Sequence, residues 1–544
     1  MDLYPVIRKA FDKTKFRTLD TGGEKPRVEG DRLIIPPALL TKTAEECFKD
    51  IAFYFRESHL DLISKPLGEA STPDNDRQVL KWLLENAVIS SKGELTLCQD
   101  TGTAIIYGWK DEGVYSGGED TEALEEGAAA AYKKNHLRAS MTAASSFFGE
   151  FNTKTNLPAQ FRIEATHPGS GKPAFRFLFV AKGGGSSNKT SLFAMTKALL
   201  EKDNFEAFLR EKIASLGTAA CPPYRLAFFI GGTSPELNLE VLKLATCEAL
   251  DDAPYFPEGE EIKDGSRGWI WRDKYWEERA MQIARETGFG AQFGGENLLL
   301  DVRILRMPRH AAACPVSMGV NCIAHRNMMA YIDSDGVHVE QLAQDPAAFL
   351  QKKGIDLSAK KEGGAEGIRI NLEKPIKEIC AELTKHKVGT MLLLSGKILV
   401  ARDAAHLKWH TLLKEGKPLP EYLPKYIIYY AGPSATPPGK IIGSLGPTTA
   451  GRMDPYGDAF MNQGFSLITL AKGNRSEGWK QACAKYGGFY LGGLGGGAAL
   501  LAEENVIGDE LVDYPELGME AVRLITVKDL PAFILIDDKN NSLY

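Results

Sequence analysis

Apolar and polar positions along the chain follow two alternating patterns. Residues 121–136 are rich in alanine and carry charges at helical spacing, which predicts a helix, and residues 189–215 show the same periodicity. Short, continuously apolar runs lie between such segments and predict buried strands. The clearest of these runs are residues 225–230, 427–431 and 534–538. The alternation of helices and strands predicts an α/β fold of the mixed α+β kind.

A polar, glycine-containing stretch, DLSAKKEGGAEG at 356–367, interrupts this alternation and shows no apolar period. A chain of 544 residues is also too long for a single hydrophobic core. We therefore predict a larger N-terminal domain over residues 1–340, a linker over 341–366 and a smaller C-terminal domain over 367–544.

Composition excludes several classes of protein. The chain is 44% hydrophobic and 25% charged with a net charge of -6, which does not favour binding to nucleic acid or to a membrane surface. No run approaches the roughly 18 apolar residues that span a membrane, and the first residues do not form a signal or transit peptide. The eight cysteines are scattered rather than arranged as a disulfide framework. A cytoplasmic protein with no membrane partner is expected.

Glycines gather in four segments, which indicates a ligand surrounded by backbone N–H groups. The segments are KGGGSSNKT (182–190), GFGAQFGGEN (288–297), GSLGPTTAGRMD (443–454) and YLGGLGGGAAL (490–500). Two of them nearly match nucleotide-binding motifs. Asn188 replaces the last glycine of a phosphate-binding loop, and Gly493–Ala498 matches a dinucleotide pattern too short to be specific. A nucleotide-binding protein remains an alternative from a different class.

Two other motifs carry less weight. The tripeptide Asp-Thr-Gly occurs at Asp20 and Asp100, but the first copy lies in a polar tract, and the copies are too close for the two lobes of an aspartic protease. The nine histidines show no zinc-binding spacing. Only His310 and His325, which lie near Cys314 and Cys322, merit consideration as site residues.

Several segments together resemble one family, the class I, iron–sulfur-dependent fumarate hydratases. The matching segments, in family order, are LCQDTGTAI, LRAS, AKGGGSSNKT, GTAACPPY, FIGGTSPE, GAQFGGEN, PRHAAACPVSMGVNC, ARDAAH, GSLGPTTAGRMD, LAKGNRS and YPELGMEA. They extend over nearly the whole chain. The related tartrate dehydratases usually divide the two halves between separate subunits, so one continuous chain favours the fumarase type and its two-domain fold, with the active site between the domains.

The resemblance implies a 4Fe–4S cluster held by Cys98, Cys221 and Cys322, with one iron left open as a Lewis acid. Cys314, eight residues before Cys322 and followed by proline, is an alternative third ligand. The family's pattern favours Cys322. The remaining cysteines lie in amphipathic segments and are expected to be buried.

The resemblance also implies reversible hydration of fumarate to (S)-malate, with tartrate or mesaconate as alternative dicarboxylate substrates. A dianionic substrate needs a cationic clamp and a proton donor or acceptor. Asp100 and Thr448 match the proton-transfer positions, and which of them is acid or base stays open. The matched substrate-binding positions are Gln99, Arg138, Gly184, His310, Arg402, Thr449, Arg452 and Lys472. The family further suggests a homodimer.

Overall fold

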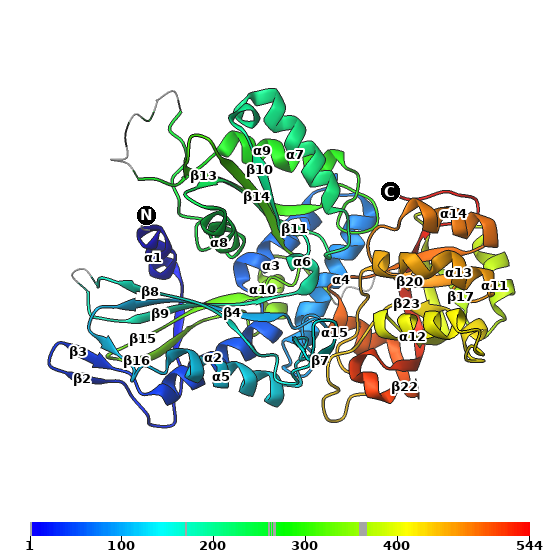
Figure 1. The fold of residues 1–544 in the computed structure, drawn as a ribbon, viewed down its shortest axis with the longest axis horizontal. Coiled ribbons are helices and arrows are strands. Elements are labelled where there is room, and N and C mark those ends of the chain that lie inside the picture. The colour runs from blue at the N-terminus through cyan, green and yellow to red at the C-terminus, as the bar shows by residue number, and fades with distance from the viewer. Residues whose placement is uncertain (1–2, 169–170, 259–261, 263, 265–267, 358–366) are drawn as a thin grey trace.

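The computed structural model describes residues 3–168, 171–258, 262, 264, 268–357 and 367–544. Within these residues, two large sheets belong to the N-terminal part and a third to the C-terminal part (Figure 1). The mixed α/β class predicted from the sequence is confirmed. Residues 358–366 of the predicted linker lie outside the described residues. A helix, α10 (Pro346–Lys352), occupies part of the same linker.

The first N-terminal sheet is mixed, because β4 pairs in parallel with β8 and antiparallel with β9. Its strands, in spatial order, are β1 (Phe16–Thr18), β16 (Gly336–Glu340), β15 (Asn327–Asp333), β9 (Phe175–Lys182), β4 (Thr103–Asp111) and β8 (Gln160–Thr166). The helices α2 (Pro37–Phe53) and α5 (Asp120–Lys134) cover one face through a common core. The helix predicted over 121–136 is therefore confirmed as α5.

The second N-terminal sheet is built around β11, every residue of which is buried. Its strands, in spatial order, are β10 (Ser191–Met195), β14 (Cys314–Asn321), β11 (Tyr224–Gly232), β13 (Leu299–Arg309) and β12 (Trp271–Arg272). Helices α7 (Lys202–Leu216) and α9 (Lys274–Glu286) pack on one face. On the other face, α8 (Pro235–Thr246) and α1 (Tyr4–Lys13) share a core with β4 of the first sheet.

The structure corrects one predicted helix and confirms the predicted strand 225–230 within β11. The first part of the helix predicted over 189–215 is instead the strand β10, and the α-helix begins only at Lys202. Side chains along β10 alternate between partly buried and exposed, and its backbone pairs with β14. Pairing at the edge of the sheet outweighs helical periodicity here.

The C-terminal sheet is parallel from β17 to β21, and the long β23 runs antiparallel to both β18 and β21. Its strands are β17 (Ile368–Asn371), β18 (Met391–Val400), β19 (Ile428–Tyr429), β20 (Ile468–Ala471), β21 (Phe489–Gly493), β23 (Val522–Ile536) and β22 (Val506–Asp513). Strand β19 lies within the predicted run 427–431, whereas the predicted run 534–538 overlaps only the last residues of β23, which begins at Val522 and ends at Ile536. The accompanying helices are α11 (Ile376–Leu383), α12 (Asp403–Lys414), α13 (Gly457–Asn462), α14 (Glu477–Tyr486) and α15 (Ala498–Leu500).

Helix α4 (Asp74–Ser90) joins the two parts of the molecule (Figure 1). Its buried Val79 and Leu83 belong to the same hydrophobic cluster as Leu491 of the C-terminal sheet, and Cys221 and Ile323 lie in that cluster as well. The Asn86 side chain accepts hydrogen bonds from the N–H groups of residues 499 and 500 in α15. The two parts therefore share a continuous core at the place where the cysteine-containing segments meet.

The remaining elements are short or peripheral. Further helices of the N-terminal part are α3 (Glu57–Ser64) and α6 (Gly184–Ser187). Small sheets comprise β2 (Arg27–Glu29), β3 (Arg32–Ile34) and β5 (Val114–Tyr115), and β6 (Thr142–Ala144) with β7 (Glu150–Asn152). The short 3-10 helices are η1 (Lys65–Gly68), η2 (Lys197–Leu200), η3 (Leu423–Lys425), η4 (Ala450–Tyr456) and η6 (Pro515–Glu520), and η5 (Leu501–Asn505) is a π-helix. No described helix is long and apolar enough to cross a membrane.

Candidate functional site

Cys98 lies on the loop between α4 and β4 and is 6% exposed. Side-chain hydrogen bonds to backbone carbonyls hold this loop. The Thr96 hydroxyl donates to the Cys98 carbonyl oxygen at 2.9 Å, and the Asn86 side-chain amide donates to the carbonyl of residue 97. The next side chain, Gln99, donates from Nε2 to the carbonyl of Pro447 at 3.3 Å. The CQDTGTA segment therefore touches the GSLGPTTAGRMD segment of the C-terminal part.

Cys221 lies between α7 and β11 in the left-handed region, with φ of 63°. Its Sγ accepts a hydrogen bond from Nζ of Lys472 at 2.7 Å. Its carbonyl oxygen accepts from the N–H of Ile323 at 3.1 Å, which ties it to the segment containing Cys322. The N–H of Cys322 in turn donates to the hydroxyl of Ser186 in α6 at 3.1 Å.

The three thiols lie close enough to influence one another's ionisation. Burial raises the pKa of Cys221 to about 12 against the opposing effect of Lys472, and the charges of Cys322 and Cys98 raise it further. Burial also raises the pKa of Cys98, with Cys322 adding to the effect and Arg326 opposing it. Neighbouring cations favour the thiolate form, which is the form that binds a metal.

The cysteines fit a 4Fe–4S cluster by the chemistry of their donors and by their surroundings. Three thiols from separate segments act electrostatically on the Lys472 ammonium, and a Cβ built on Gly495 would come within 2.6 Å of the Cys221 Sγ. The glycine thus lets the backbone approach the Cys221 side chain closely, which a larger residue would prevent. Among the described residues, no group of three His, Cys, Asp or Glu side chains could hold a single metal ion. A cluster differs, because its irons take thiolates at separate corners.

Cys314 lies elsewhere. It begins β14 opposite Met195 of β10, and it is buried in the core that this sheet forms with α7 and α9. Burial raises its pKa, and the neighbouring charges that affect it are Arg309 and Arg306 rather than other cysteines.

Asp100 is surrounded by donors and cations. Its Oδ2 accepts from the N–H of Gly184 at 2.8 Å, and its Oδ1 lies 3.4 Å from Nη2 of Arg138. Burial opposes ionisation of this carboxyl, but Arg138, Arg326, the Gly184 N–H and Lys472 outweigh it and lower its pKa to about 2. The side chain of Asp100 is therefore a carboxylate at neutral pH.

Arg138 is 8% exposed and is fixed by a hydrogen bond from Nε to the Ser140 hydroxyl at 3.0 Å. Burial lowers its pKa, while Asp100 raises it and Arg402 lowers it, so a cation of the C-terminal part lies near. Arg402 pairs with Glu520 and lies within 4.0 Å of Asp403. Arg138 and Arg402 therefore approach the site from opposite sides of the domain boundary.

Thr448, Arg452 and Lys472 form a connected group on the C-terminal side. Nη2 of Arg452 donates a hydrogen bond to the Thr448 hydroxyl oxygen, and Nη1 of Arg452 lies 3.3 Å from an Asp403 carboxylate oxygen. The Lys472 N–H donates to the Thr448 carbonyl oxygen at 3.1 Å. Thr449, the residue before η4, donates its hydroxyl to the carbonyl of Ala219 at 3.4 Å, close to Cys221.

The structure places His310 differently from the other predicted residues. It lies on the exposed turn between β13 and β14, where its Nδ1 accepts from the N–H of Ala312 at 3.2 Å. Among the described contacts, none joins its ring to the three cysteines or to the arginines. His310 as a substrate ligand therefore stays a prediction. Asp20 of the other Asp-Thr-Gly tripeptide accepts from the N–H of Gly22 within an exposed turn.

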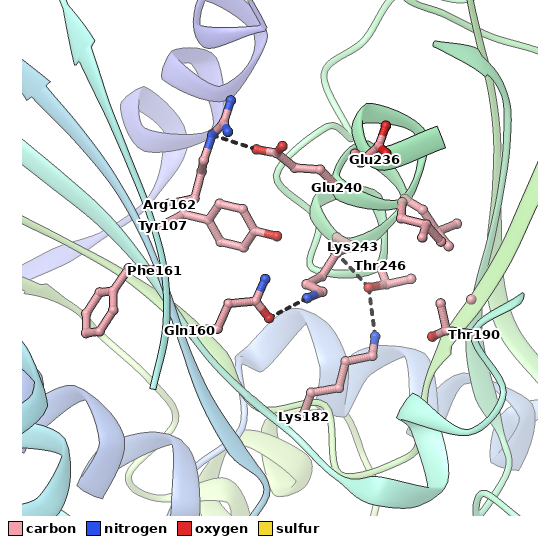
Figure 2. Close-up of a pocket in the computed structure, with 13 residues that line it drawn as sticks. Tyr107, Gln160, Phe161, Arg162, Lys182, Thr190, Glu236, Glu240, Lys243 and Thr246 are labelled. Atoms are coloured by element: carbon pink, nitrogen blue, oxygen red, sulfur yellow. Dashed lines mark hydrogen bonds and ion pairs between the residues drawn. The ribbon is translucent and has the colours of Figure 1, made fainter. Parts of the chain in front are cut away.

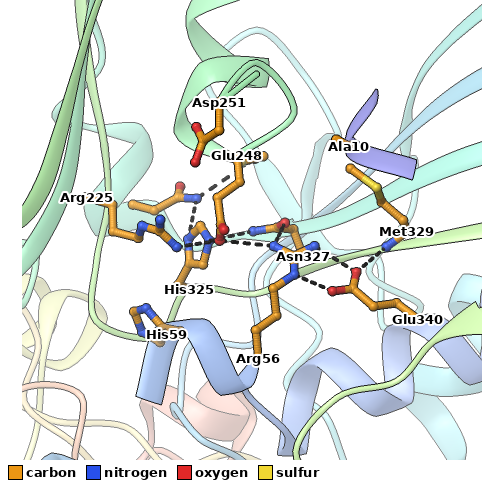
Figure 3. Close-up of polar contacts among 12 residues, drawn as sticks. Ala10, Arg56, His59, Arg225, Glu248, Asp251, His325, Asn327, Met329 and Glu340 are labelled. Atoms are coloured by element: carbon orange, nitrogen blue, oxygen red, sulfur yellow. Dashed lines mark hydrogen bonds and ion pairs between the residues drawn. The ribbon is translucent and has the colours of Figure 1, made fainter. Parts of the chain in front are cut away.

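His325 belongs to a buried polar network rather than to the substrate side (Figure 3). Its Nε2 lies 2.7 Å from Glu248, whose other neighbours include Arg225 and Arg56. Burial lowers the pKa of His325, and Arg225 lowers it further, so the ring is neutral. Asn321 hydrogen-bonds the second ring nitrogen at 3.0 Å. This network anchors the segment that carries Cys322 and Arg326.

Sequence reasoning did not identify Arg326 as a site residue. It is 3% exposed, and its Nη1 donates to the Asp100 backbone carbonyl at 2.5 Å. A Cβ built on Gly183 would lie 3.3 Å from its Nη2 and 3.2 Å from the Asp100 Oδ2. A signal was present, since Arg326 follows Cys322 by four residues. Glu520, the partner of Arg402, lies in the segment YPELGMEA and was also not singled out.

Comparison with known proteins identifies the family. Residues 41–331 match the family model described as fumarate hydratase, and residues 336–544 match the one described as fumarase C-terminus. The "Fumarate hydratase class I, anaerobic" of Escherichia coli (strain K12) is 46% identical over 517 residues, covering 95% of this chain and 91% of that protein. The chain belongs to the class I fumarate hydratase family. The cofactor of this family is a 4Fe–4S cluster, and the site formed by Cys98, Cys221 and Cys322 fits it.

Two further relatives add detail to this family assignment. "Fumarate hydratase 2" of Leishmania major is 45% identical over 513 residues, which cover 94% of this chain and 87% of the relative. A "Putative L(+)-tartrate dehydratase subunit beta" of Methanocaldococcus jannaschii is 36% identical over 167 residues, which are 30% of this chain but 86% of that subunit. The subunit thus corresponds to one part of a chain that here is continuous.

Proposed function

We propose that this member of the class I fumarate hydratase family catalyses the reversible hydration of fumarate to (S)-malate. The observation that carries the proposal is the convergence of three cysteines from separate segments with Asp100, Arg138, Thr448, Arg452 and Lys472 at the domain boundary. A small dicarboxylate matches this excess of cations.

Cys98, Cys221 and Cys322 would hold the cluster. When bound through three thiolates, a 4Fe–4S cluster supplies Lewis-acid chemistry at the iron that no cysteine holds. Lys472 donates to the Cys221 sulfur and opposes the rise in the pKa of this thiol, which favours the ligating thiolate form. The buried network behind His325 keeps Cys322 and Arg326 in place.

Arg138, Arg402 and Arg452 would bind the two substrate carboxylates, because guanidinium groups match carboxylates in a two-point geometry. Each of them already lies beside an acidic side chain, Asp100, Glu520 or Asp403. These carboxylates hold the arginines in place before substrate arrives. The amide of Gln99, the hydroxyl of Thr449 and the N–H of Gly184 would orient the substrate. His310 is retained as a further predicted ligand.

The two proton-transfer candidates differ in their surroundings. Since the pKa of Asp100 is lowered to about 2, its carboxylate is a weak base at neutral pH. It can accept a hydrogen bond from a substrate or water hydroxyl and orient it. The Thr448 hydroxyl oxygen receives a hydrogen bond from Arg452, which leaves its own hydrogen free and would stabilise negative charge on the oxygen. We assign proton transfer at the substrate carbon to Thr448 and hydroxyl orientation to Asp100.

The test is an assay of the protein purified without oxygen. Fumarate should be hydrated to (S)-malate, identified by an (S)-specific malate dehydrogenase, and malate should be dehydrated to fumarate. Tartrate and mesaconate, assayed in parallel, should react far more slowly. A protein that loads a cluster but dehydrates tartrate and leaves malate unchanged would overturn the proposed substrate.

We also propose a homodimer in the cytoplasm. The eight cysteines are all unpaired, which suits a reducing compartment. One relative is named a mitochondrial fumarate hydratase, so location varies among the relatives. Light scattering coupled to size-exclusion chromatography should give twice the chain mass. A single chain mass at micromolar concentration would contradict the dimer.

A further inference from the structure

A cavity of about 440 Å³ lies between the two N-terminal sheets (Figure 2). Tyr107 of β4, Gln160 of β8 and Lys182 of β9 line it from one side, and Lys243 and Thr246 of α8 line it from the other. None of the three cysteines is among its lining residues. Its volume is that of an ordinary small-molecule site.

The cavity contains two lysines that form no ion pair with a carboxylate among the described residues. Lys182 is 6% exposed, and its Nζ donates to the Asn321 side chain at 2.9 Å and to the Thr246 hydroxyl at 3.2 Å. The Lys243 Nζ donates to the Gln160 amide oxygen at 3.0 Å. All of these acceptors are neutral. Lys243 is partly buried, whereas Lys182 is buried, and a buried ammonium group normally has an anionic partner because removing a lone charge from water is costly.

The acidic residues around the cavity do not supply that partner. Glu240 pairs with Arg162 at 3.1 Å, and Arg162 pairs with Glu164 as well; Glu240 also acts on Lys243 electrostatically but forms no ion pair with it among the described residues. Glu236 is exposed at the start of α8, where backbone N–H groups and the Ser234 hydroxyl lower the pKa of its carboxyl. The ammonium groups of Lys182 and Lys243 are thus left without a directly paired carboxylate in the described part of the chain.

A hydroxyl is also available in the cavity. Tyr107 is 3% exposed, and none of the described hydrogen bonds involves its OH group, which points into the cavity in Figure 2. Burial raises its pKa far above the usual value, so it stays a neutral donor. A buried phenol hydroxyl ordinarily finds a partner.

We propose that this cavity binds a small oxyanion with about two negative charges, either a phosphate or a dicarboxylate, between Lys182, Lys243 and the Tyr107 hydroxyl. Such a ligand would give both lysines a direct anionic partner and the phenol an acceptor. The proposal concerns a second site and does not depend on the proposed reaction.

The position of Lys182 connects this cavity to the candidate active site. Lys182 directly precedes Gly183 and Gly184, the latter of which donates to Asp100. Its acceptor Asn321 directly precedes Cys322. An anion held by Lys182 would therefore contact the strand end that positions Asp100, which is a suitable location for an effector.

Isothermal titration calorimetry of the cluster-loaded protein tests the proposal, with inorganic phosphate and malonate as probes in a buffer free of both. The variants are Lys243→Met, which keeps the aliphatic stem, and Arg452→Ala, which weakens binding in the candidate active site. Lys417→Met is a matched control, because Lys417 is an exposed lysine paired with Glu415 in the C-terminal part. Tyr107→Phe serves as a second cavity variant if Lys243→Met does not fold.

We expect at least one probe to bind with an affinity that falls by about tenfold or more in Lys243→Met, the effect of losing one charge-assisted hydrogen bond. That binding should persist in Arg452→Ala and Lys417→Met. Phosphate and malonate distinguish the two possible sources of the ligand. The proposal is overturned if neither probe binds, or if all binding is lost in Arg452→Ala and unchanged in both cavity variants.

Discussion

At the scale of single residues, the cations around the candidate site have different partners and should therefore have different roles. Arg452 contacts Thr448 and Asp403, whereas Lys472 contacts the Cys221 sulfur. The first arrangement suits substrate binding and the second suits cluster retention. Substituting these two residues should thus separate binding from assembly.

Arg452→Ala should raise KM for malate by about tenfold or more and depress kcat, because a charge-assisted contact to a carboxylate and a donor to Thr448 are both lost. The iron content and the visible absorption of the cluster should stay at the wild-type level. Steady-state kinetics and iron analysis of the same sample check this. If the variant loses its iron, Arg452 has a structural role and its assignment as a substrate ligand is wrong.

Lys472→Met should behave in the opposite way. Burial alone lowers the pKa of Lys472, but Cys221 and Cys98 raise it above its usual value, so the lysine is a cation beside the Cys221 sulfur. Removing that cation should raise the pKa of Cys221 further and reduce the iron content of the purified protein. Lys472→Arg, which keeps the charge, should retain more iron. Equal and full iron loading in both variants would contradict this role.

At the scale of elements, short loops at strand ends place the functional groups. The loop between β21 and α15 is an example, because its Gly495 faces the Cys221 sulfur and its N–H donates to the Gln292 side chain at 2.7 Å. The glycine pattern around Gly493 suggested a nucleotide fingerprint. In the fold it instead allows the backbone to approach a cysteine closely.

Gly495→Ala should therefore reduce iron content and activity together. The added Cβ would lie 2.6 Å from the Cys221 Sγ, so the cysteine or the loop must shift. Gly68→Ala is a matched control, since nothing lies within 4 Å of the position that its added Cβ would take. Iron analysis of both proteins tests the prediction. Full iron content in Gly495→Ala would show that the loop has room to move away.

Helix α12 carries a second prediction, about pH. Burial lowers the pKa of His406 to about 4 from the ordinary 6.5. Because the folded pKa is the lower one, the unfolded chain takes up the proton first, and stability falls as the pH drops from 6.5 towards 4. Between about pH 7 and pH 5 this residue alone should cost roughly 2 kcal/mol.

His406→Phe removes this titration and keeps an aromatic ring among Trp409, Tyr430 and Phe460. Urea unfolding without oxygen, followed by tryptophan fluorescence at both pH values, should show a smaller loss of stability at low pH than in the wild type. Burial also lowers the pKa of His59 to about 4. Because His59 is present in both proteins, it contributes the same pH dependence of stability to each. An unchanged pH dependence would show that His406 does not stay neutral in the folded protein.

At the scale of the whole molecule, the sequence predicted the class of the fold but not the convergence of the site. Alternating apolar runs predicted strands such as β11, because continuous burial leaves a continuous apolar signal. The same approach failed at β10, where an edge strand with half-buried side chains imitates helical periodicity.

Cys98, Cys221 and Cys322 could not be grouped by spacing, since the shared core of α4 and the C-terminal sheet brings them together. Resemblance to a family supplied their grouping, and the structure adds Arg326, Ser186 and Lys472 as their immediate supports. Contacts of this kind depend on tertiary packing. Periodicity along the chain does not encode them.

The central claim is that these three cysteines, and not Cys314, hold the cluster. The most direct test is the iron and acid-labile sulfide content of anaerobically purified wild type and of the variants Cys98→Ser, Cys221→Ser, Cys322→Ser and Cys314→Ser. The wild type and Cys314→Ser should contain about four iron atoms per chain, and the other three should lose most of them. A full cluster in any of those three variants, or its loss in Cys314→Ser alone, would contradict the account.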